Sequence, residues 1–492
     1  MKKDSFYITT TIPYVNAEPH IGFALELVQS DVIARYQRLI GRNVFFSTGT
    51  DEHGQKIWEA SQKEGKDVQD YVDKYAQNYK DLKEKLNISN DNFIRTTNKE
   101  HIKAAQEFWN LCEKKGDIYK KKYKGLYCVG CEIFIKEKDL VDGKCKLHPT
   151  KIPEIIEEEN YFFRLGNYKE KLLEYLSNEK VIIPEWRRQE AIDFVKDGME
   201  DFSISRNKKR FSWGIEIPGD DTQVMYVWFD ALVNYISTLG WPNPHPDPLP
   251  KVEGENLFEK FWQNGDTVQI AGKDMVKFQS VMWQGMLMSA GLATTDRIVY
   301  HGFITGEGGI KMSKSIGNVI NPNEIVKEYG TDALRYFLLR EISSFEDSSF
   351  TMERFKESYN SGLANGLGNL VSRVMKMATV NNILFDKDFI DKEHDSFYKD
   401  YKNAISSFNL TQAMNAIWGI ISWADQSIQS KQPFKKIKTQ KQDAEIDIKF
   451  LLWDLHLVSE LLTPFLPETS EKIKKCVLEN KMPEKPLFLR KE

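Results

Sequence analysis

Cysteine is scarce in this sequence, with five residues among 492. Cys128, Cys131 and Cys145 lie close together, whereas Cys112 and Cys476 stand apart. A disulfide framework is typical of small secreted domains and uses cysteines in pairs, so this distribution argues against one. We interpret the cluster as metal ligands and expect a reducing compartment.

Long apolar runs and a dominant charge are also missing. No stretch reaches the roughly 18 apolar residues typical of a membrane-spanning helix. The start, MKKDSFYITTTIPY, has neither the apolar segment nor the small-residue cleavage site of a secretory signal. With 68 basic and 72 acidic residues the net charge is −4, which excludes coating of nucleic acid by bulk charge. We therefore expect a cytoplasmic protein that recognises any nucleic acid locally.

The order of hydrophobic patterns predicts an α/β fold. The run SFYITTTIPY is typical of a strand, HIGFALELVQSDVIARYQRL has helical spacing, and NVFFSTG is a second strand. Strand, helix and strand in this order indicate a doubly wound parallel sheet of the Rossmann type. TQVMYVWFDALVNYIS, DTVQIAGKDMVKFQSVMWQGMLMSAGL and RIVYHGFIT are expected to complete that sheet, and beyond Asn318 the pattern is helical.

Changes in composition and hydrophobic pattern along the chain predict several domains, and the length of the chain allows several. Between the two halves of the sheet, short segments rich in lysine and glutamate surround the cysteine cluster, as expected of an inserted domain. The predicted divisions are a first half of the sheet domain at 1–114, the insertion at 115–220, the second half at 221–310, a lysine loop and linking helices at 311–365, and an all-α bundle at 366–492.

Two separated motifs suggest phosphate chemistry. In PHIG, His20 begins the first helix, where unpaired backbone N–H groups and the helix dipole favour phosphate oxygens. Alone, such a histidine is more often a helix cap or a packing residue. In GEGGIKMSKS, glycines surround Lys311 and Lys314, two cations that can neutralise charge on departing pyrophosphate. The alternative for this second motif is a solvated lysine loop.

The cysteine cluster has the spacing of a zinc knuckle. CVGC and CKLH supply Cys128, Cys131, Cys145 and His148. Three thiolates and one imidazole suit a closed tetrahedral zinc site. Because such a set leaves no protein ligand position open, we expect one structural zinc ion.

Together, the HIG and KMSKS motifs resemble the paired signatures of class I aminoacyl-tRNA synthetases. From residue 6 to the end the chain is similar to the methionyl-tRNA synthetase family, on the segments PYVNAEPHIG, GTDEHGQKI, ENYFFRL, YVWFDALVNYIS, AGKDMVKF and GGIKMSKS and on the single zinc knuckle. The insertion is too short for the editing domain of the leucine, isoleucine and valine enzymes.

The resemblance implies methionine activation with ATP and magnesium, followed by transfer to the 3′ end of tRNA(Met), including initiator tRNA. It implies His20, Lys311 and Lys314 as catalytic residues. The ATP site would comprise His20, Gly22, Gly272, Asp274, His301, Lys311 and Lys314. The methionine site would comprise Ile12, Tyr14, Asp51, Trp228, Ala231, Tyr235 and Phe278. The anticodon would meet Asn369, Arg373 and Phe434, and the linking region 311–365 would contact the tRNA stem.

Elementary chemistry agrees with these roles. The carboxylate of Asp51 can pair with an ammonium group, and aromatic rings accommodate a polarizable thioether. Trp228 and Tyr235 are spaced to share one face of a helix, although an ordinary aromatic core has the same spacing. Asn369 and Arg373 also share a helix face, and Phe434 can stack on an unpaired base.

The sequence departs from the family pattern at three positions. Phe23 replaces the last histidine of the first signature, Gln279 replaces a frequent histidine beside the methionine pocket, and Leu232 replaces a proline. Because a phenyl ring cannot donate to phosphate, we expect a slower enzyme. The alternatives are an impaired synthetase-like protein that binds tRNA or methionine, and a different class I synthetase or nucleotidyltransferase. The chain ends at KPLFLRKE, where the family's bundle ends, so we expect a monomer.

Overall fold

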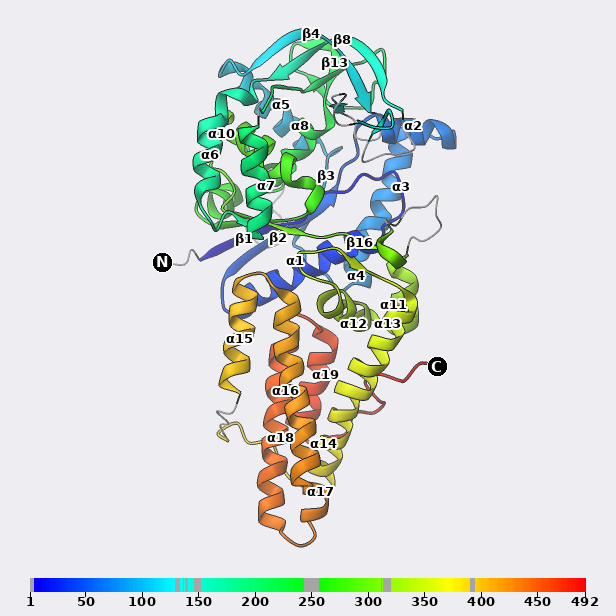
Figure 1. The fold of residues 1–492 in the computed structure, drawn as a ribbon, viewed down its shortest axis with the longest axis vertical. Helices are drawn as coiled ribbons and strands as arrows, with labels where there is room; N and C mark the ends of the chain where they lie inside the picture. Colours follow the sequence, from blue (N-terminus) through cyan, green and yellow to red (C-terminus); the bar gives the residue numbers. More distant parts are fainter. Residues whose placement is uncertain are drawn as a thin grey trace. The chain divides into compact units, whose positions relative to one another are not determined.

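The computed structural model describes residues 4–128, 133–135, 137, 140–145, 152–197, 199–242, 256–310, 312, 320–389 and 394–492 (Figure 1). The chain forms two compact units. Unit 1 comprises residues 1–19, 41–83 and 90–300, and unit 2 comprises residues 20–40, 84–89 and 301–492. Among the described residues, no helix is long and apolar enough to cross a membrane.

Unit 1 contains a six-stranded sheet with the order β3-β2-β1-β14-β15-β9. Its strands are β1 (Ser5–Thr9), β2 (Asn43–Thr50), β3 (Asn92–Arg95), β9 (Ile182–Ile183), β14 (Asp266–Gly272) and β15 (Arg297–His301). β1 pairs in parallel with both β2 and β14, and the pairs β2–β3 and β15–β9 are also parallel. The predicted α/β fold with a Rossmann-like parallel sheet is confirmed.

The strand order marks one edge of this sheet as the expected place for a ligand. β1 lies between β2, which follows it in sequence, and β14, which comes from the second half of the unit. In open α/β sheets, ligands bind outside the carboxyl ends of the strands where the strand order reverses. The segments that begin after Thr9, Thr50 and Gly272 leave the sheet at this edge.

Helices and an aromatic core complete unit 1. Its α-helices are α2 (Gln55–Glu64), α3 (Val68–Lys80), α5 (Lys99–Lys114), α6 (Lys169–Ser177), α7 (Glu185–Lys196), α8 (Val227–Leu232), α9 (Asn234–Ser237) and α10 (Trp283–Ala290), and α4 (Leu82–Lys85) contributes to both units. Unit 1 also contains the 3-10 helices η2 (Leu165–Tyr168) and η4 (Lys273–Met275) and the π-helices η3 (Phe258–Gln263) and η5 (Phe278–Met282). Phe108, Trp109 and Trp283 are fully buried in the core that these elements share.

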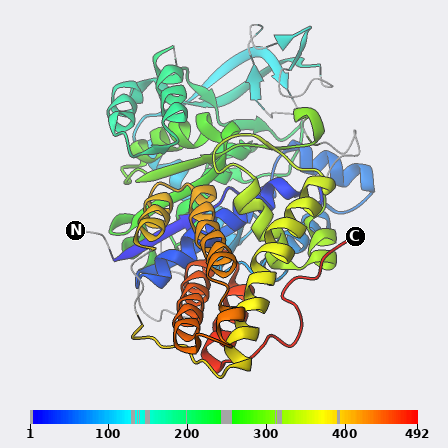
Figure 2. The same cartoon turned by 60° about the horizontal axis from the view of Figure 1, so that its bottom comes forward.

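The lysine- and glutamate-rich segment folds as antiparallel β-structure. β4 (Ile118–Cys128) and β8 (Glu154–Phe163) form a long ribbon, visible in Figure 2, that β5 (Ile133–Ile135) and β10 (Phe202–Ser203) extend. Lys122 faces Glu159 and Lys124 faces Glu157 across the ribbon. Opposite charges facing each other stabilise an antiparallel pair, so the repeated charges suit a two-stranded ribbon. A separate small hairpin joins β6 (Leu140–Val141) and β7 (Lys144–Cys145).

One sequence expectation about the sheet is wrong. The strand before VWFDAL, β13 (Asp220–Met225), does not join the parallel sheet but pairs antiparallel with β11 (Ser205–Asn207) and β12 (Glu216–Ile217). Instead, β9, from the predicted insertion, pairs with β15. The segment around Trp228 and Tyr235 also forms two short helices, α8 and α9, which meet at Val233.

Unit 2 is helical. It contains α1 (Ile21–Leu39), α11 (Pro322–Tyr329), α12 (Thr331–Tyr336), α13 (Met352–Ser358), α14 (Asn369–Val380), α15 (Asp395–Ser406), α16 (Leu410–Lys431), α17 (Pro433–Lys436), α18 (Lys441–Leu462) and α19 (Pro467–Glu479). The 3-10 helix η6 (Glu307–Gly309), the π-helices η7 (Phe337–Glu341) and η8 (Tyr359–Gly368), and the strands β16 (Ile304–Thr305) and β17 (Ser348–Ser349) complete it. α14, α16, α18 and α19 pack together as the predicted bundle (Figure 1).

Candidate functional site

The carboxyl edge of the sheet in unit 1 brings Asp51 beside the loop that follows β1. The backbone N–H of Asp51 donates to the carbonyl of Pro13 at 2.9 Å, and the N–H of Val15 donates to the carbonyl of Asp51 at 3.2 Å. Tyr14 and Asp51 therefore form a parallel bridge beyond the ends of their strands. Asp51 is 2% exposed, so its carboxylate lies in a largely water-excluded position suited to an ammonium partner.

Three aromatic rings lie together at the same edge. The indole of Trp228 on α8 stacks on the ring of Phe278, with centroids 4.0 Å apart and planes at 17°. The ring of Tyr14 meets Trp228 edge-on, with a centroid distance of 6.3 Å. The structure therefore brings together Tyr14, Asp51, Trp228 and Phe278, four of the seven residues predicted to bind methionine.

The other predicted methionine residues belong to neighbouring segments of unit 1. Gln279 donates from Nε2 to the Tyr235 hydroxyl at 2.7 Å, which links Tyr235 to the residue after Phe278. Ala231 is buried on α8, one turn after Trp228. Ile12 is half-buried in the loop after β1. Gln279 thus orients a tyrosine of the predicted pocket.

The end of β14 carries the residues predicted to meet the ribose. Gly272 is buried as the last residue of the strand, and Asp274 is exposed in η4 directly after it. This arrangement leaves a carboxylate accessible at the edge where β1 and β14 are neighbours. It is the place at which a nucleotide binds in a doubly wound sheet.

His20 forms the N-terminal cap of α1 in unit 2. Its Nδ1 accepts a hydrogen bond from the backbone N–H of Gly22 at 3.1 Å, and the side chain is exposed. A side chain at Gly22 would place its Cβ 3.0 Å from the His20 ring, so glycine fits this turn without displacing the imidazole. Phe23 is 6% exposed, and its phenyl ring packs inside the protein.

His301, predicted near the adenine, is tied to α1 within unit 2. Its Nε2 lies 2.9 Å from the carboxylate of Glu26, and its Nδ1 donates to the carbonyl of Gly302 at 2.7 Å. Both side chains are buried. Glu26 was not identified from the sequence, although an acidic residue inside the apolar run FALEL is a signal that could have indicated it.

The predicted lysine loop and the predicted zinc knuckle lie partly outside the described residues. Lys311 and Lys314 lie outside the described residues, whereas the preceding Gly308 and Gly309 adopt positive φ angles of 66° and 77°. Cys128 and Cys145 are buried at the ends of β4 and β7, but Cys131 and His148 lie outside the described residues. Among the residues that the structure does describe, no group of three or more His, Cys, Asp and Glu could hold a metal ion.

The predicted anticodon residues lie on two helices of unit 2. Asn369 is exposed at the first position of α14, and Arg373 follows one turn later. The Arg373 guanidinium donates to the Asp425 carboxylate of α16 at 2.8 Å. Phe434 on α17 is 45% exposed, with the Lys435 ammonium 5.8 Å from its ring centroid. The exposed ring can therefore receive an unpaired base.

Comparison with known proteins agrees with both units. The family described as "tRNA synthetases class I (M)" matches residues 6–149 and 135–375, and the "Anticodon binding domain of methionyl tRNA ligase" matches residues 386–486. The chain belongs to the methionine–tRNA ligase family. It is therefore an aminoacyl-tRNA synthetase, with a Rossmann-like domain and a helical anticodon-binding domain.

Individual relatives are similar over nearly the whole chain. The methionine–tRNA ligase of Fusobacterium nucleatum is 38% identical over 96% of this chain and 74% of its own length. That of Rhizobium meliloti is 39% identical over 95% of this chain and 90% of its own length. The structure of Mycobacterium tuberculosis methionyl-tRNA synthetase in complex with methionyl-adenylate has a TM-score of 0.87 at 35% identity, covering 96% of this chain and 93% of that one.

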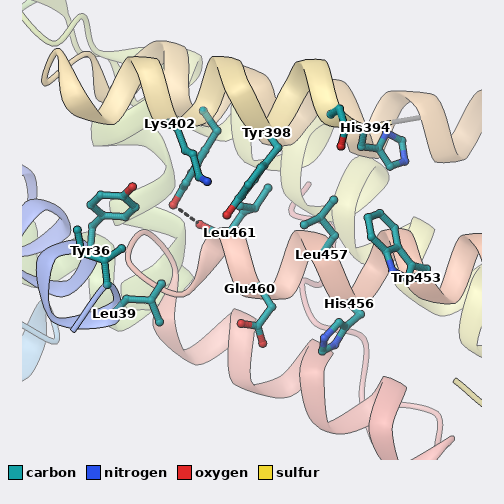
Figure 3. Close-up of a pocket in the computed structure, with 13 residues that line it drawn as sticks. Tyr36, Leu39, His394, Tyr398, Lys402, Trp453, His456, Leu457, Glu460 and Leu461 are labelled. Carbon is teal, nitrogen blue, oxygen red and sulfur yellow. Dashed lines mark hydrogen bonds between the residues drawn. The ribbon is translucent and has the colours of Figure 1, made fainter. Parts of the chain in front are cut away.

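Unit 2 also has a hollow of about 700 Å³ that contains none of the predicted site residues (Figure 3). Its walls come from the end of α1, from α15 and from α18, with Tyr36, Tyr398 and Trp453 among the lining side chains. His394 at its rim is buried and lies 2.7 Å from the Asp454 carboxylate.

Proposed function

We propose that this chain activates L-methionine with ATP to methionyl-adenylate and transfers the methionyl group to the 3′ end of tRNA(Met), including initiator tRNA. The observation that carries the proposal is the cluster in unit 1, where Tyr14 is bridged through the backbone to Asp51 and meets the ring of Trp228, which stacks on Phe278. A buried carboxylate next to aromatic faces suits a ligand that has an ammonium group at one end and a thioether at the other.

Each part of methionine has a partner in this cluster. Asp51 would pair with the ammonium group. Trp228 and Phe278 would enclose the thioether, because sulfur packs favourably against aromatic rings. Tyr235, held by Gln279 at 2.7 Å, and the neighbouring Ala231 would limit the length and width of the side chain. Ile12 and Tyr14, in the loop after β1, would cover the bound methionine from that side.

The chemistry needs orientation and charge stabilisation from the protein. The methionine carboxylate attacks the α-phosphorus of ATP in line, the bond to the bridging oxygen breaks, and pyrophosphate leaves. No enzyme nucleophile takes part. His20 and the N-terminal N–H groups of α1 would bind phosphate oxygens, and Lys311 and Lys314 would offset the charge on pyrophosphate. Gly272 and Asp274 would hold the ribose, and His301 would lie near the adenine.

The second step transfers the acyl group to a ribose hydroxyl of tRNA. The hydroxyl oxygen attacks the carbonyl carbon of the adenylate, and AMP leaves. Asn369, Arg373 and Phe434 would select the anticodon through hydrogen bonds to base edges and through stacking. Holding both reactants in a near-attack geometry supplies much of the acceleration in such reactions.

We include one structural zinc ion and the magnesium that accompanies ATP in the proposal. Cys128 and Cys145 are buried thiols at the ends of β4 and β7, and with Cys131 and His148 they would make a three-sulfur, one-nitrogen donor set. Such a set fits a tetrahedral zinc ion, which would stabilise the fold of the insertion. We also propose that the protein acts as a monomer in the cytoplasm.

The test is methionine-dependent ATP–pyrophosphate exchange by the purified protein, with cysteine, leucine and isoleucine in parallel. We expect exchange with methionine alone, at a rate reduced by the absence of a donor at Phe23. One such donor is typically worth about 10²–10³ in rate, which leaves a measurable enzyme. Absence of exchange with every amino acid, in folded protein that contains zinc, would favour the impaired synthetase-like protein instead.

A further inference from the structure

A buried carboxylate in unit 1 accepts hydrogen bonds from two histidines. The Oδ2 of Asp230 lies 2.7 Å from Nδ1 of His53, and its Oδ1 lies 2.8 Å from Nε2 of His101. The second nitrogen of His101, Nδ1, lies 2.8 Å from the Ser237 hydroxyl. All four residues are at most 5% exposed. None of them belongs to the residues assigned to methionine or ATP.

The hydrogen bonds fix how protons are arranged in this cluster. An ionised carboxylate only accepts, so His53 must donate from Nδ1 and His101 from Nε2. His101 can then accept from Ser237 with its other nitrogen. Burial alone would raise the pKa of Asp230, but the neighbouring imidazoles, His53 foremost, outweigh burial and lower the pKa. The carboxylate therefore stays charged and holds both imidazoles.

The cluster joins the two sides of the predicted methionine pocket. His53 follows Asp51 by two residues on the loop after β2, and Asp230 follows Trp228 by two residues on α8. Trp213 holds the loop from the other side, since its indole lies 5.5 Å from the His53 ring and donates to the carbonyl of Glu52 at 2.6 Å. The His53–Asp230 hydrogen bond thus joins the loop that carries Asp51 to the helix that carries Trp228.

We propose that Asp230, His53 and His101 are positioning residues for methionine recognition. The cluster sets the spacing between the Asp51 loop, which would meet the ammonium group, and α8, whose Trp228 would meet the thioether. The inference rests on the proposed function and adds that the affinity for methionine depends on this cluster. Loss of the cluster weakens the binding of methionine, while ATP binding, which depends on other segments, is retained.

The experiment compares Asp230→Asn and His53→Gln with the wild type. Asparagine retains the shape of Asp230 but lacks its charge, so we expect the KM for methionine to rise about tenfold, the loss of about 1.4 kcal/mol. The KM for ATP should stay within about twofold. Calorimetric titration with methionine alone should show the same weakening without requiring turnover. His53→Gln removes one of the two imidazoles and should reproduce the direction of the effect.

The matched control is Asp454→Asn, which alters the buried His394–Asp454 pair of unit 2, also at 2.7 Å. It should lower thermal stability to a similar extent and leave the KM for methionine unchanged. The inference is overturned if both test variants bind methionine like the wild type, or if the KM values for methionine and ATP rise together. Absence of methionine binding by the wild type would instead overturn the proposed function and, with it, this inference.

Discussion

The guanidinium of Arg335 lies 2.8 Å from the carboxylate of Asp31, and neither side chain has exposed surface. Arg335 on α12 also donates to the carbonyls of Pro464 and Phe465, which precede α19. Asp31 lies on α1, whose N-terminal cap is His20. Within unit 2, one ion pair therefore fastens the helix with the HIG motif to the helical bundle.

Removal of one partner of this pair should destabilise the protein strongly. Arg335→Met leaves the Asp31 carboxylate buried without its main cation, and such losses cost about 3–5 kcal/mol. Urea unfolding followed by circular dichroism would measure the change. Asp31→Leu combined with Arg335→Met should be less destabilised than Arg335→Met, because no buried charge is left. As a control, Lys103→Ala removes an exposed ion pair to Glu100 and should change little. A shift with Arg335→Met as small as that control would contradict the prediction.

The same pair should give stability a defined dependence on pH. Burial by itself raises the pKa of Asp31, but Arg335, Arg35 and hydrogen bonds from Ser89 outweigh burial and hold the pKa below its usual value. The unfolded chain therefore takes up the proton first. The contribution is fully present above about pH 4, the usual aspartate value, and is lost as pH falls through the lower folded pKa.

The corresponding measurement is the urea midpoint of the wild type and Asp31→Asn between pH 7 and pH 3. The difference between them should be largest at neutral pH and shrink in acid. Asp332 provides a comparison of opposite sign, because burial, the largest cause, raises its pKa. As pH falls, protonation of Asp332 stabilises the folded wild type. The stability of Asp332→Asn relative to the wild type should therefore decrease in acid. Equal pH profiles for the wild type and Asp31→Asn would refute the account.

The sequence predicted those elements whose hydrophobic period or capping residues lie within the element itself. The strand, helix and strand around His20 are present, and His20 caps α1 as the first residue of its motif. Asn369 and Arg373 share α14 as their spacing indicated. These features could be predicted because hydrophobic period and capping chemistry are properties of neighbouring residues.

Other features depend on partners that are far apart in sequence. The two-residue strand Ile182–Ile183 is too short to show a period, and only its pairing with β15 identifies it. Glu26 and Asp425 lie far in sequence from their partners His301 and Arg373, so no local spacing could pair them. The aromatic pair Trp228 and Phe278 was predicted through the family resemblance, since nothing local links α8 to η5.

Asp51 should govern methionine affinity if its carboxylate meets the ammonium group. Asp51→Asn retains the shape but lacks the charge, and loss of one partner of a buried charged pair costs about 2–5 kcal/mol. The kcat/KM for methionine in pyrophosphate exchange should therefore fall about thirtyfold or more, with the KM for ATP little changed. Asp51→Glu retains the charge and should recover part of the loss. An Asp51→Asn enzyme within a fewfold of the wild type would exclude this role.

His20 combines a structural and a proposed catalytic role, and two substitutions separate them. Its Nδ1 caps α1 through the N–H of Gly22. Asparagine is among the best N-cap residues and alanine among the poorest, with a difference of about 1 kcal/mol. His20→Asn should therefore be as stable as the wild type, and His20→Ala less stable. Both lack the imidazole and should lower kcat for exchange by about 10²–10³. Normal exchange by His20→Asn would show that His20 is only a cap.

Phe434 should act on tRNA and not on amino acid activation. Stacking of an unpaired base on an aromatic side chain is worth about 1–3 kcal/mol, so Phe434→Ala should lower kcat/KM for tRNA about fivefold to a hundredfold. Pyrophosphate exchange does not require tRNA and should be unchanged. Phe434→Trp retains a stacking surface and should aminoacylate as well as the wild type.

Trp423 is the matched control for Phe434, because it lies on α16 with the same exposure of 45% but belongs to none of the predicted anticodon residues. Trp423→Ala removes a comparable exposed ring and should leave kcat/KM for tRNA unchanged. Equal losses of kcat/KM for tRNA in Phe434→Ala and Trp423→Ala would contradict base stacking on Phe434, because removal of any exposed aromatic ring of the bundle would then have the same effect. A loss confined to Phe434→Ala would place base stacking at α17, where the Lys435 ammonium beside the ring can also attract the phosphate backbone.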